Sequence, residues 1–97
     1  MSYRIADKVN GTIGGLFATE IEAKAFIEEE IAEGMENETN WLMELAHATQ
    51  EGGAVNMEDE GYVRRILSAP EADRRKVAME CAGERMRADY TVVLSAE

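Results

Sequence analysis

The chain of 97 residues has little of the chemistry on which many enzymes and metal sites depend. It holds one cysteine, Cys81, and one histidine, His47. A single cysteine forms no internal disulfide and leaves no cysteine pair for zinc, which predicts a reduced, cytoplasmic protein. No apolar leader follows Met1, and no apolar run approaches the about 20 residues of a membrane span. No phosphate-binding loop, dinucleotide fingerprint or Ser–His–Asp set is present, so we predict no enzyme and no cofactor.

Basic residues are also scarce, and a long internal stretch has none. The chain carries 20 acidic residues against 10 basic ones, a formal net charge of −10. Between Lys24 and Arg64 there is no Lys or Arg, while eleven acidic residues fall there. Residues 1–60 have a net charge of −11 and residues 61–97 a net charge of +1. This imbalance argues against direct contact with nucleic acid or an anionic membrane.

The length allows a single domain, residues 1–97, and its first segment is predicted to be a β-hairpin. Asn10-Gly11 is a strong turn signal between two runs with apolar residues. A two-residue turn would pair Ile5 with Leu16. We favour a bulged turn, which gathers the apolar side chains on one face: Tyr3, Ile5, Ile13 and Phe17. Gly14-Gly15 then indicates a kink or a close approach of the backbone.

A helical region is predicted from about residue 20 to about residue 51. It begins at a capping box, Thr19 to Glu22, and ends at Gly52-Gly53. Gly34, followed by candidate N-caps at Asn37 and Thr39, favours two helical segments nearly in line. The apolar stripe along this region follows helical spacing: Ala23, Phe26, Ile27, Ile31, Met35, Leu42, Leu45 and Thr49.

The rest of the chain predicts two shorter helices and a final strand. Asn56 is a plausible cap for the first helix, and Ser68-Ala69-Pro70-Glu71 is a start signal for the second. Tyr90–Leu94 reads as a β-strand, which needs a partner just as the hairpin needs a third strand. The predicted fold is therefore α+β: a three-stranded antiparallel sheet, made of the hairpin and the C-terminal strand, covered on one face by three to four helices.

The acidic helical region is the most informative feature for function. Eight acids between Glu20 and Glu38 lie along roughly 28 Å of helix, which gives one acid per about 3.5 Å. This spacing is close to that of the phosphates along one DNA strand, about 3.4 Å. A rigid row of carboxylates would imitate a polyanion and bind a basic groove in a fast, salt-sensitive way. The alternative is acidity that serves only solubility. The predicted contact surface is Glu20, Glu22, Glu28, Glu29, Glu33, Glu36, Glu38 and Glu44, with Trp41 as an apolar anchor.

Other sites were weighed against simpler explanations. Glu44 and His47 match the Glu-x-x-His element of di-iron bundles, but the spacing predicts a surface histidine. Residues 56–61 echo the start of a calcium loop, but position 12 of that loop would be Leu67 instead of glutamate. Cys81 is predicted to be a buried structural thiol. The arginines of residues 61–87 suggest a helix-turn-helix only weakly, and neutralisation of the acidic half explains them better.

We therefore expect a non-enzymatic acidic module that inhibits or regulates a basic, nucleic-acid-processing protein. Small acidic proteins of this character are often carried by phages or mobile elements, an analogy of character and not of sequence. The alternative is a self-associating module, a homodimer formed through Trp41, Met43 and the bare face of the sheet. Salt distinguishes the two, because polyanion mimicry weakens with ionic strength and an apolar dimer does not.

Overall fold

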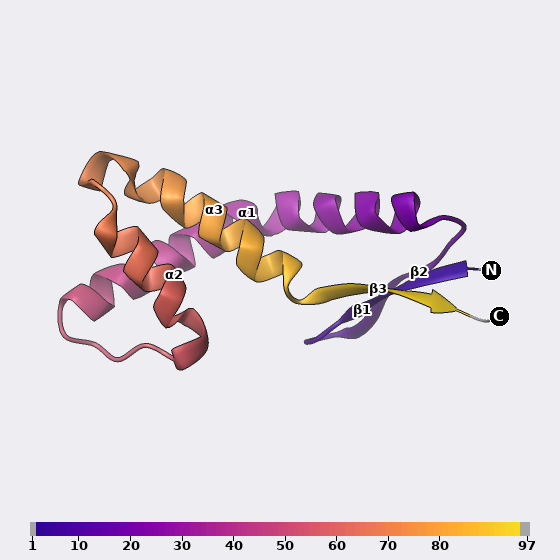
Figure 1. Cartoon of the computed structure of the whole chain (residues 1–97), viewed down its shortest axis with the longest axis horizontal. Helices are drawn as coiled ribbons and strands as arrows, with labels where there is room; N and C mark the ends of the chain where they lie inside the picture. Colours follow the sequence, from indigo (N-terminus) through magenta and orange to yellow (C-terminus); the bar gives the residue numbers. More distant parts are fainter. Residues whose placement is uncertain (1, 96–97) are drawn as a thin grey trace. The chain divides into compact units, whose positions relative to one another are not determined.

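A computed structural model describes residues 2–95 of the chain and has the predicted α+β class (Figure 1). Its elements in order are β1 (Ser2–Asp7), β2 (Gly11–Phe17), α1 (Glu20–Gln50), α2 (Met57–Ser68), a 3₁₀ turn (Glu71–Asp73), α3 (Arg74–Arg87) and β3 (Tyr90–Ser95). The three strands form one antiparallel sheet in the order β2-β1-β3, which confirms the predicted sheet.

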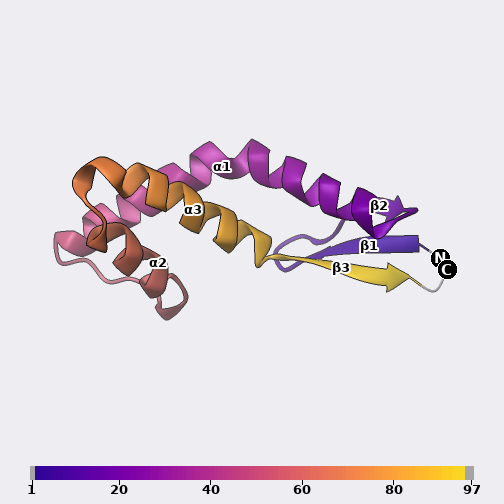
Figure 2. The same cartoon turned by 45° about the horizontal axis from the view of Figure 1, so that its top comes forward.

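The described residues divide into two compact units, which share the two longer helices. The sheet unit comprises the residues up to 33 and from 85 onward, and the helical unit comprises Gly34–Glu84. In the sheet unit, the helical cover comes from the first half of α1 (Figure 2). In the helical unit, the second half of α1 joins α2 and most of α3.

The register of the hairpin confirms the apolar face expected from the favoured turn and excludes the two-residue turn, which would pair Ile5 with Leu16. Tyr3 pairs with Phe17 and Ile5 with Ile13, so these four side chains share one face of the sheet. Asp7 pairs with Gly11, so the turn contains three residues, and only Gly11 of the predicted Asn10-Gly11 pair has a positive φ, +82°. The Asp7 carboxylate holds the turn by accepting hydrogen bonds from the backbone N–H of Val9 (2.8 Å) and the side-chain amide of Asn10 (3.1 Å).

The irregularity in the strand pairing lies in β2, at the glycine pair. The register shifts between Tyr3 and Ile5, and Gly14 and Gly15 there adopt φ of +73° and +77°. Only glycine takes such values without strain. A Cβ on Gly14 would also lie 2.9 Å from Cζ of Phe17 and 3.0 Å from Cε1 of Phe26. Gly14 therefore allows these two rings to approach, with centroids 5.4 Å apart.

The first half of α1 begins as predicted and packs on the sheet. Thr19 Oγ1 accepts a hydrogen bond from the Glu22 N–H (3.1 Å), and the Glu22 carboxylate accepts one from the Ala18 N–H (3.3 Å). These bonds satisfy two N–H groups at the helix start, the role of a capping box. Ala23 and Ile27 of the predicted stripe are buried, as is Ile5 of the sheet.

The predicted break in the helical region is wrong, because α1 is one continuous helix of 31 residues. Asn37 lies inside the helix and is exposed, and Thr39 is fully buried. Neither residue caps a second segment. The division between the two units nevertheless falls at Gly34, the residue that suggested the break.

The helical unit has its own apolar core. The second half of α1 buries Thr39, Leu42 and Ala46, a spacing of three and four residues that keeps them on one face. Leu45 and Thr49 of the predicted stripe are only half-buried. The buried residues of the other two helices complete this core: Val63, Ile66, Ala78, Cys81 and Ala82.

The ends of the helices follow local rules. At the end of α1, Gly52 has a φ of +98°, its N–H bonds to the Thr49 carbonyl (3.1 Å), and the Gly53 N–H bonds to the Ala48 carbonyl (2.8 Å). This pair of bonds is the Schellman motif that the glycines predicted. Asn56 precedes α2 as its N-cap, without a side-chain capping bond. Pro70 precedes the 3₁₀ turn that leads into α3.

Candidate functional site

The candidate functional residues are the acidic side chains of α1, and within each unit the structure separates them by what each carboxylate contacts. In the sheet unit, Glu22, Glu29 and Glu33 lie at positions i, i+7 and i+11, which recur on one side of a helix. The buried Ala23 and Ile27 lie on a different side of the helix. The three acidic side chains are therefore exposed to solvent.

Several acids of the predicted row in the sheet unit already have partners within it. Glu20 pairs with Lys24 (2.9 Å), one turn further along α1. Glu28 accepts two hydrogen bonds from the Arg87 guanidinium, at 3.0 and 2.9 Å. Glu22 is occupied in the capping box. These three carboxylates serve the fold of the sheet unit and are less available to a second molecule.

The Glu28–Arg87 pair also changes the ionisation of both groups. The hydrogen bonds from Arg87 lower the pKa of Glu28, and those same bonds raise the pKa of Arg87. A carboxyl group whose pKa is lower in the folded state stabilises the fold above its unfolded pKa, and this contribution disappears as the pH falls through the lowered value. Both side chains are more than half exposed, which keeps the effect on stability small.

Glu29 and Glu33 remain without a hydrogen bond or ion pair to any of residues 2–95. They are one helical turn apart, and like charges at this spacing destabilise a helix by a few tenths of a kcal/mol. The sheet unit thus keeps two adjacent, exposed carboxylates that its own bases do not neutralise.

In the helical unit, Glu36 and Glu44 show the same behaviour. Both are exposed, they lie eight residues apart, and neither has a polar partner in the part of the chain that the structure describes. Glu38 differs, because it is half-buried and takes part in an interaction within the chain. Trp41 is 39% exposed and also has a contact of its own. The acids of the predicted contact surface are therefore of three kinds: bonded within the sheet unit, half-buried and engaged at Glu38, or exposed without a partner among residues 2–95. The predicted spacing of about one charge per phosphate treated the acids from Glu20 to Glu38 as equivalent.

Four arginines of the helical unit have partners inside this unit, one of them on the same helix and the others on neighbouring segments. Arg64 pairs with Glu60 (2.5 Å), and Arg65 with Glu84. Arg74 donates from Nε to the Ala69 carbonyl (3.4 Å), and Arg75 donates to Oδ1 of Asn40 (3.1 Å). In the predicted acidic row, Arg87 pairs with Glu28, while Glu36 and Glu44 have no basic partner among residues 2–95.

The two sequence patterns that resemble metal sites do not gather metal ligands in the described part of the chain. His47 is exposed, as predicted, and residues 2–95 contain no cluster of three side chains able to hold a metal ion. Of residues 56–61, which echo the start of a calcium loop, Asn56 is the N-cap of α2 and 57–61 are helical. Cys81 is fully buried, and burial raises the pKa of its thiol, so it is an unreactive core residue.

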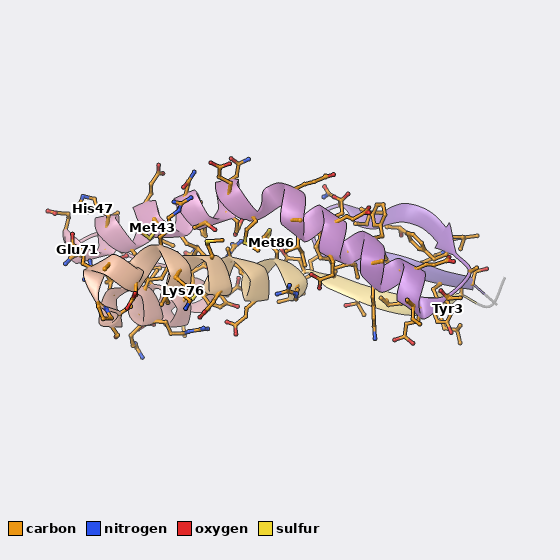
Figure 3. All side chains as sticks on the ribbon, turned by 90° about the horizontal axis from the view of Figure 1, so that it is seen from above. Tyr3, Met43, His47, Glu71, Lys76 and Met86 are labelled. Carbon is orange, nitrogen blue, oxygen red and sulfur yellow. The ribbon has the colours of Figure 1, made fainter. Side chains whose placement is uncertain are left out.

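The helical unit contains a cleft that the sequence did not predict. A hollow of about 270 Å³ is lined by residues from the end of α1, the end of α2, the 3₁₀ turn and the start of α3. Figure 3 shows Met43, His47 and Glu71 at this end of the unit. Half of the lining residues are apolar, and the other half are polar or charged, with both signs of charge: Met43, Ala46, Ile66 and Leu67, and His47, Gln50, Glu71 and Arg74. No sequence signal links these residues, because four separate elements contribute them.

Compared with protein families, curated proteins and solved structures, the chain matches none of them significantly. No helix within residues 2–95 combines the length and apolar character needed to cross a membrane.

Proposed function

We propose that the protein is a non-enzymatic acidic binding module that inhibits or regulates a basic, nucleic-acid-processing protein. The unpartnered carboxylates on the outward side of α1 would occupy the groove that otherwise receives phosphates. The observation that carries the proposal is the exposed, unneutralised set on this helix: Glu29 and Glu33 in the sheet unit, and Glu36 and Glu44 in the helical unit.

The charge distribution supports this proposal over acidity for solubility alone. A surface that serves solubility gains from interspersed charges, because Glu–Lys pairs along a helix stabilise it. The chain makes such pairs where it has bases, at Glu20–Lys24 and Glu60–Arg64. It leaves the central part of α1 without them, although the repulsion there costs stability. A basic partner would relieve this repulsion and gain electrostatic steering.

The proposal is tested by capture from a lysate rich in nucleic-acid-binding proteins, with elution by duplex DNA. We expect the wild-type protein to retain a basic protein that duplex DNA releases, because the two would compete for one groove. Two double variants test the two units separately: Glu29→Lys with Glu33→Lys, and Glu36→Lys with Glu44→Lys. We expect each to lower the affinity for the captured protein at least about tenfold, since close charge pairs at interfaces are worth on the order of 1.5 kcal/mol or more.

A double variant with the same net charge serves as the control. Glu51 and Glu58 are exposed and lie outside α1. Their change to lysine alters the total charge as much as either test variant does. Equal loss of affinity in the control would show that only total charge matters, and unchanged affinity in both test variants would refute the proposed surface. Circular dichroism and urea unfolding verify that each variant is folded.

A further inference from the structure

The two edges of the sheet differ in their ability to pair with another strand. The β2 edge is interrupted by the register shift at Gly14 and Gly15, and a bulge of this kind protects an edge strand against pairing. The β3 edge is regular, with six consecutive residues paired to β1 without a shift. It contains no charged residue, proline or glycine within Tyr90–Ser95. Figure 2 shows β3 along one side of the sheet, and no strand of the described chain pairs with its outer side.

The pairing of β3 with β1 shows which backbone groups face outward. The Lys8 N–H donates to the Asp89 carbonyl (3.0 Å), and Asp7 pairs with Tyr90 in the next position. Because antiparallel residues alternate between hydrogen-bonded and non-hydrogen-bonded pairs, Thr91, Val93 and Ser95 direct their backbone groups to β1. The backbone N–H and C=O groups of Tyr90, Val92 and Leu94 consequently point to the open edge.

We propose that β3 is a self-association edge, which pairs antiparallel with β3 of a second copy about a two-fold axis at Val92. In this register, the three outward residues of each copy meet those of the other: Val92 opposite Val92, and Tyr90 opposite Leu94 on both sides. Each such pair exchanges two backbone hydrogen bonds. The two sheets become one sheet of six strands, an isologous arrangement in which one patch is its own partner.

The side chains fit this register as well as the backbone does. Val92 and Leu94 share the face of the sheet that carries the buried Ile5, and the facing pairs there are aliphatic or aromatic. On the opposite face, Thr91 meets Val93 of the second copy. Leu94 and Val93 are 53% and 45% exposed in the single chain, apolar surface that the pairing would cover. Such cross-strand pairs stabilise a sheet, and none brings like charges together.

This interaction is independent of the proposed acidic surface, which lies on the outward side of α1. A contact along one strand is small, so the association is expected to be weak and dependent on concentration. A basic partner and a second copy would thus use different parts of the molecule.

Two exposed leucines, one on each edge, provide a matched test. Leu16 on β2 is 50% exposed and Leu94 on β3 is 53% exposed. Sedimentation of the full chain up to millimolar concentration is expected to show a monomer–dimer equilibrium. Leu94→Lys is expected to raise the dissociation constant about tenfold, because it removes both Tyr90–Leu94 pairs. Leu16→Lys, with the same change in charge, is expected to leave it within about twofold, since β2 takes no part in the register centred on Val92.

Disulfide trapping tests the register itself. Thr91→Cys and Val93→Cys place thiols at positions that face each other across the two-fold axis, within the reach of a disulfide. A mixture of the two variants is expected to form a mixed disulfide dimer much faster than either variant alone. The wild type, whose Cys81 is buried, gives the background rate. A monomer at millimolar concentration in 0.5 M salt, equal effects of the two leucine variants, or equal trapping in the single-variant samples would each overturn the proposal.

Discussion

At the scale of single residues, the glycine pair in β2 shows two separate reasons for glycine: a positive φ and the lack of space for a Cβ. Gly14 and Gly15 have nearly the same positive φ, so each would strain any other residue. Only Gly14 also lacks space, because Phe17 and Phe26 fill the position of its Cβ. The pair predicted a kink from the sequence alone, and the kink is present. The lack of space at Gly14 could not be predicted in this way. It depends on Phe26, which belongs to α1, and the sequence does not show that this ring packs against β2.

These two positions predict different losses of stability. Gly15→Ala is expected to lower the free energy of unfolding by about 1–2 kcal/mol, the cost of a left-handed conformation for a residue with a Cβ. Gly14→Ala is expected to lose that amount and roughly 1–3 kcal/mol more, because an overpacked core must displace its neighbours. Urea unfolding of both variants measures the difference. Equal losses would mean that the Phe17 and Phe26 rings yield at no cost.

At the scale of elements, the fold was predictable where local chemistry decides it. The capping box at Thr19, the Schellman glycines at Gly52-Gly53 and the facing residues of the hairpin each follow from neighbouring residues. The continuity of α1 did not follow, because Asn37 and Thr39 have a stronger preference for a cap than for a helix interior. Burial in the core of the helical unit outweighs this preference and keeps α1 continuous. Thr39 is buried there, and its hydroxyl has no hydrogen-bond partner among the described residues. The weakly apolar Thr39 and Ala46 were therefore missed as core positions.

Substitution of Asn37 by alanine and by glycine distinguishes one continuous helix from two, because the order of stability of the two variants is opposite in the two cases. In the interior of a continuous helix, Asn37→Ala is expected to raise the free energy of unfolding by about 0.5 kcal/mol and Asn37→Gly to lower it by a few tenths. At an N-cap the order would be the opposite, with a loss of about 1 kcal/mol for alanine and only a few tenths for glycine. Asn37 is exposed, so packing does not obscure the comparison. Thermal or urea unfolding of the three proteins gives the order, and a more stable glycine variant than alanine variant would contradict a continuous α1.

At the scale of the whole molecule, the acidic excess was evident from the sequence, but its distribution was not. The Glu28–Arg87 pair joins residues 59 positions apart, and no local pattern relates them. This long-range pair, together with the local contacts of Glu20 and Glu22 and the interaction of Glu38, reduces the predicted row of carboxylates. The acids that remain are Glu29, Glu33, Glu36 and Glu44. This set is smaller than the predicted one, and its members share one property: their carboxylates have no polar partner among residues 2–95.

The net charge predicts opposite effects of salt on the two proposed interactions. Binding of a basic protein joins unlike charges, and screening over a Debye length of about 30 Å at 0.01 M and about 8 Å at 0.15 M ionic strength weakens it. Pairing of two copies joins two chains of net charge −10, so the same increase in salt removes repulsion and strengthens it. Between these concentrations we expect the affinity for the captured basic protein to fall at least about tenfold, since steered association depends steeply on ionic strength. Over the same range we expect the monomer–dimer dissociation constant to decrease. Sedimentation and a binding titration on one preparation measure both. A dimer that weakens as salt is added would indicate charged groups of unlike sign in its interface, which contradicts pairing through the uncharged β3. A basic partner whose affinity does not change with salt would contradict an electrostatic role for the acidic residues of α1.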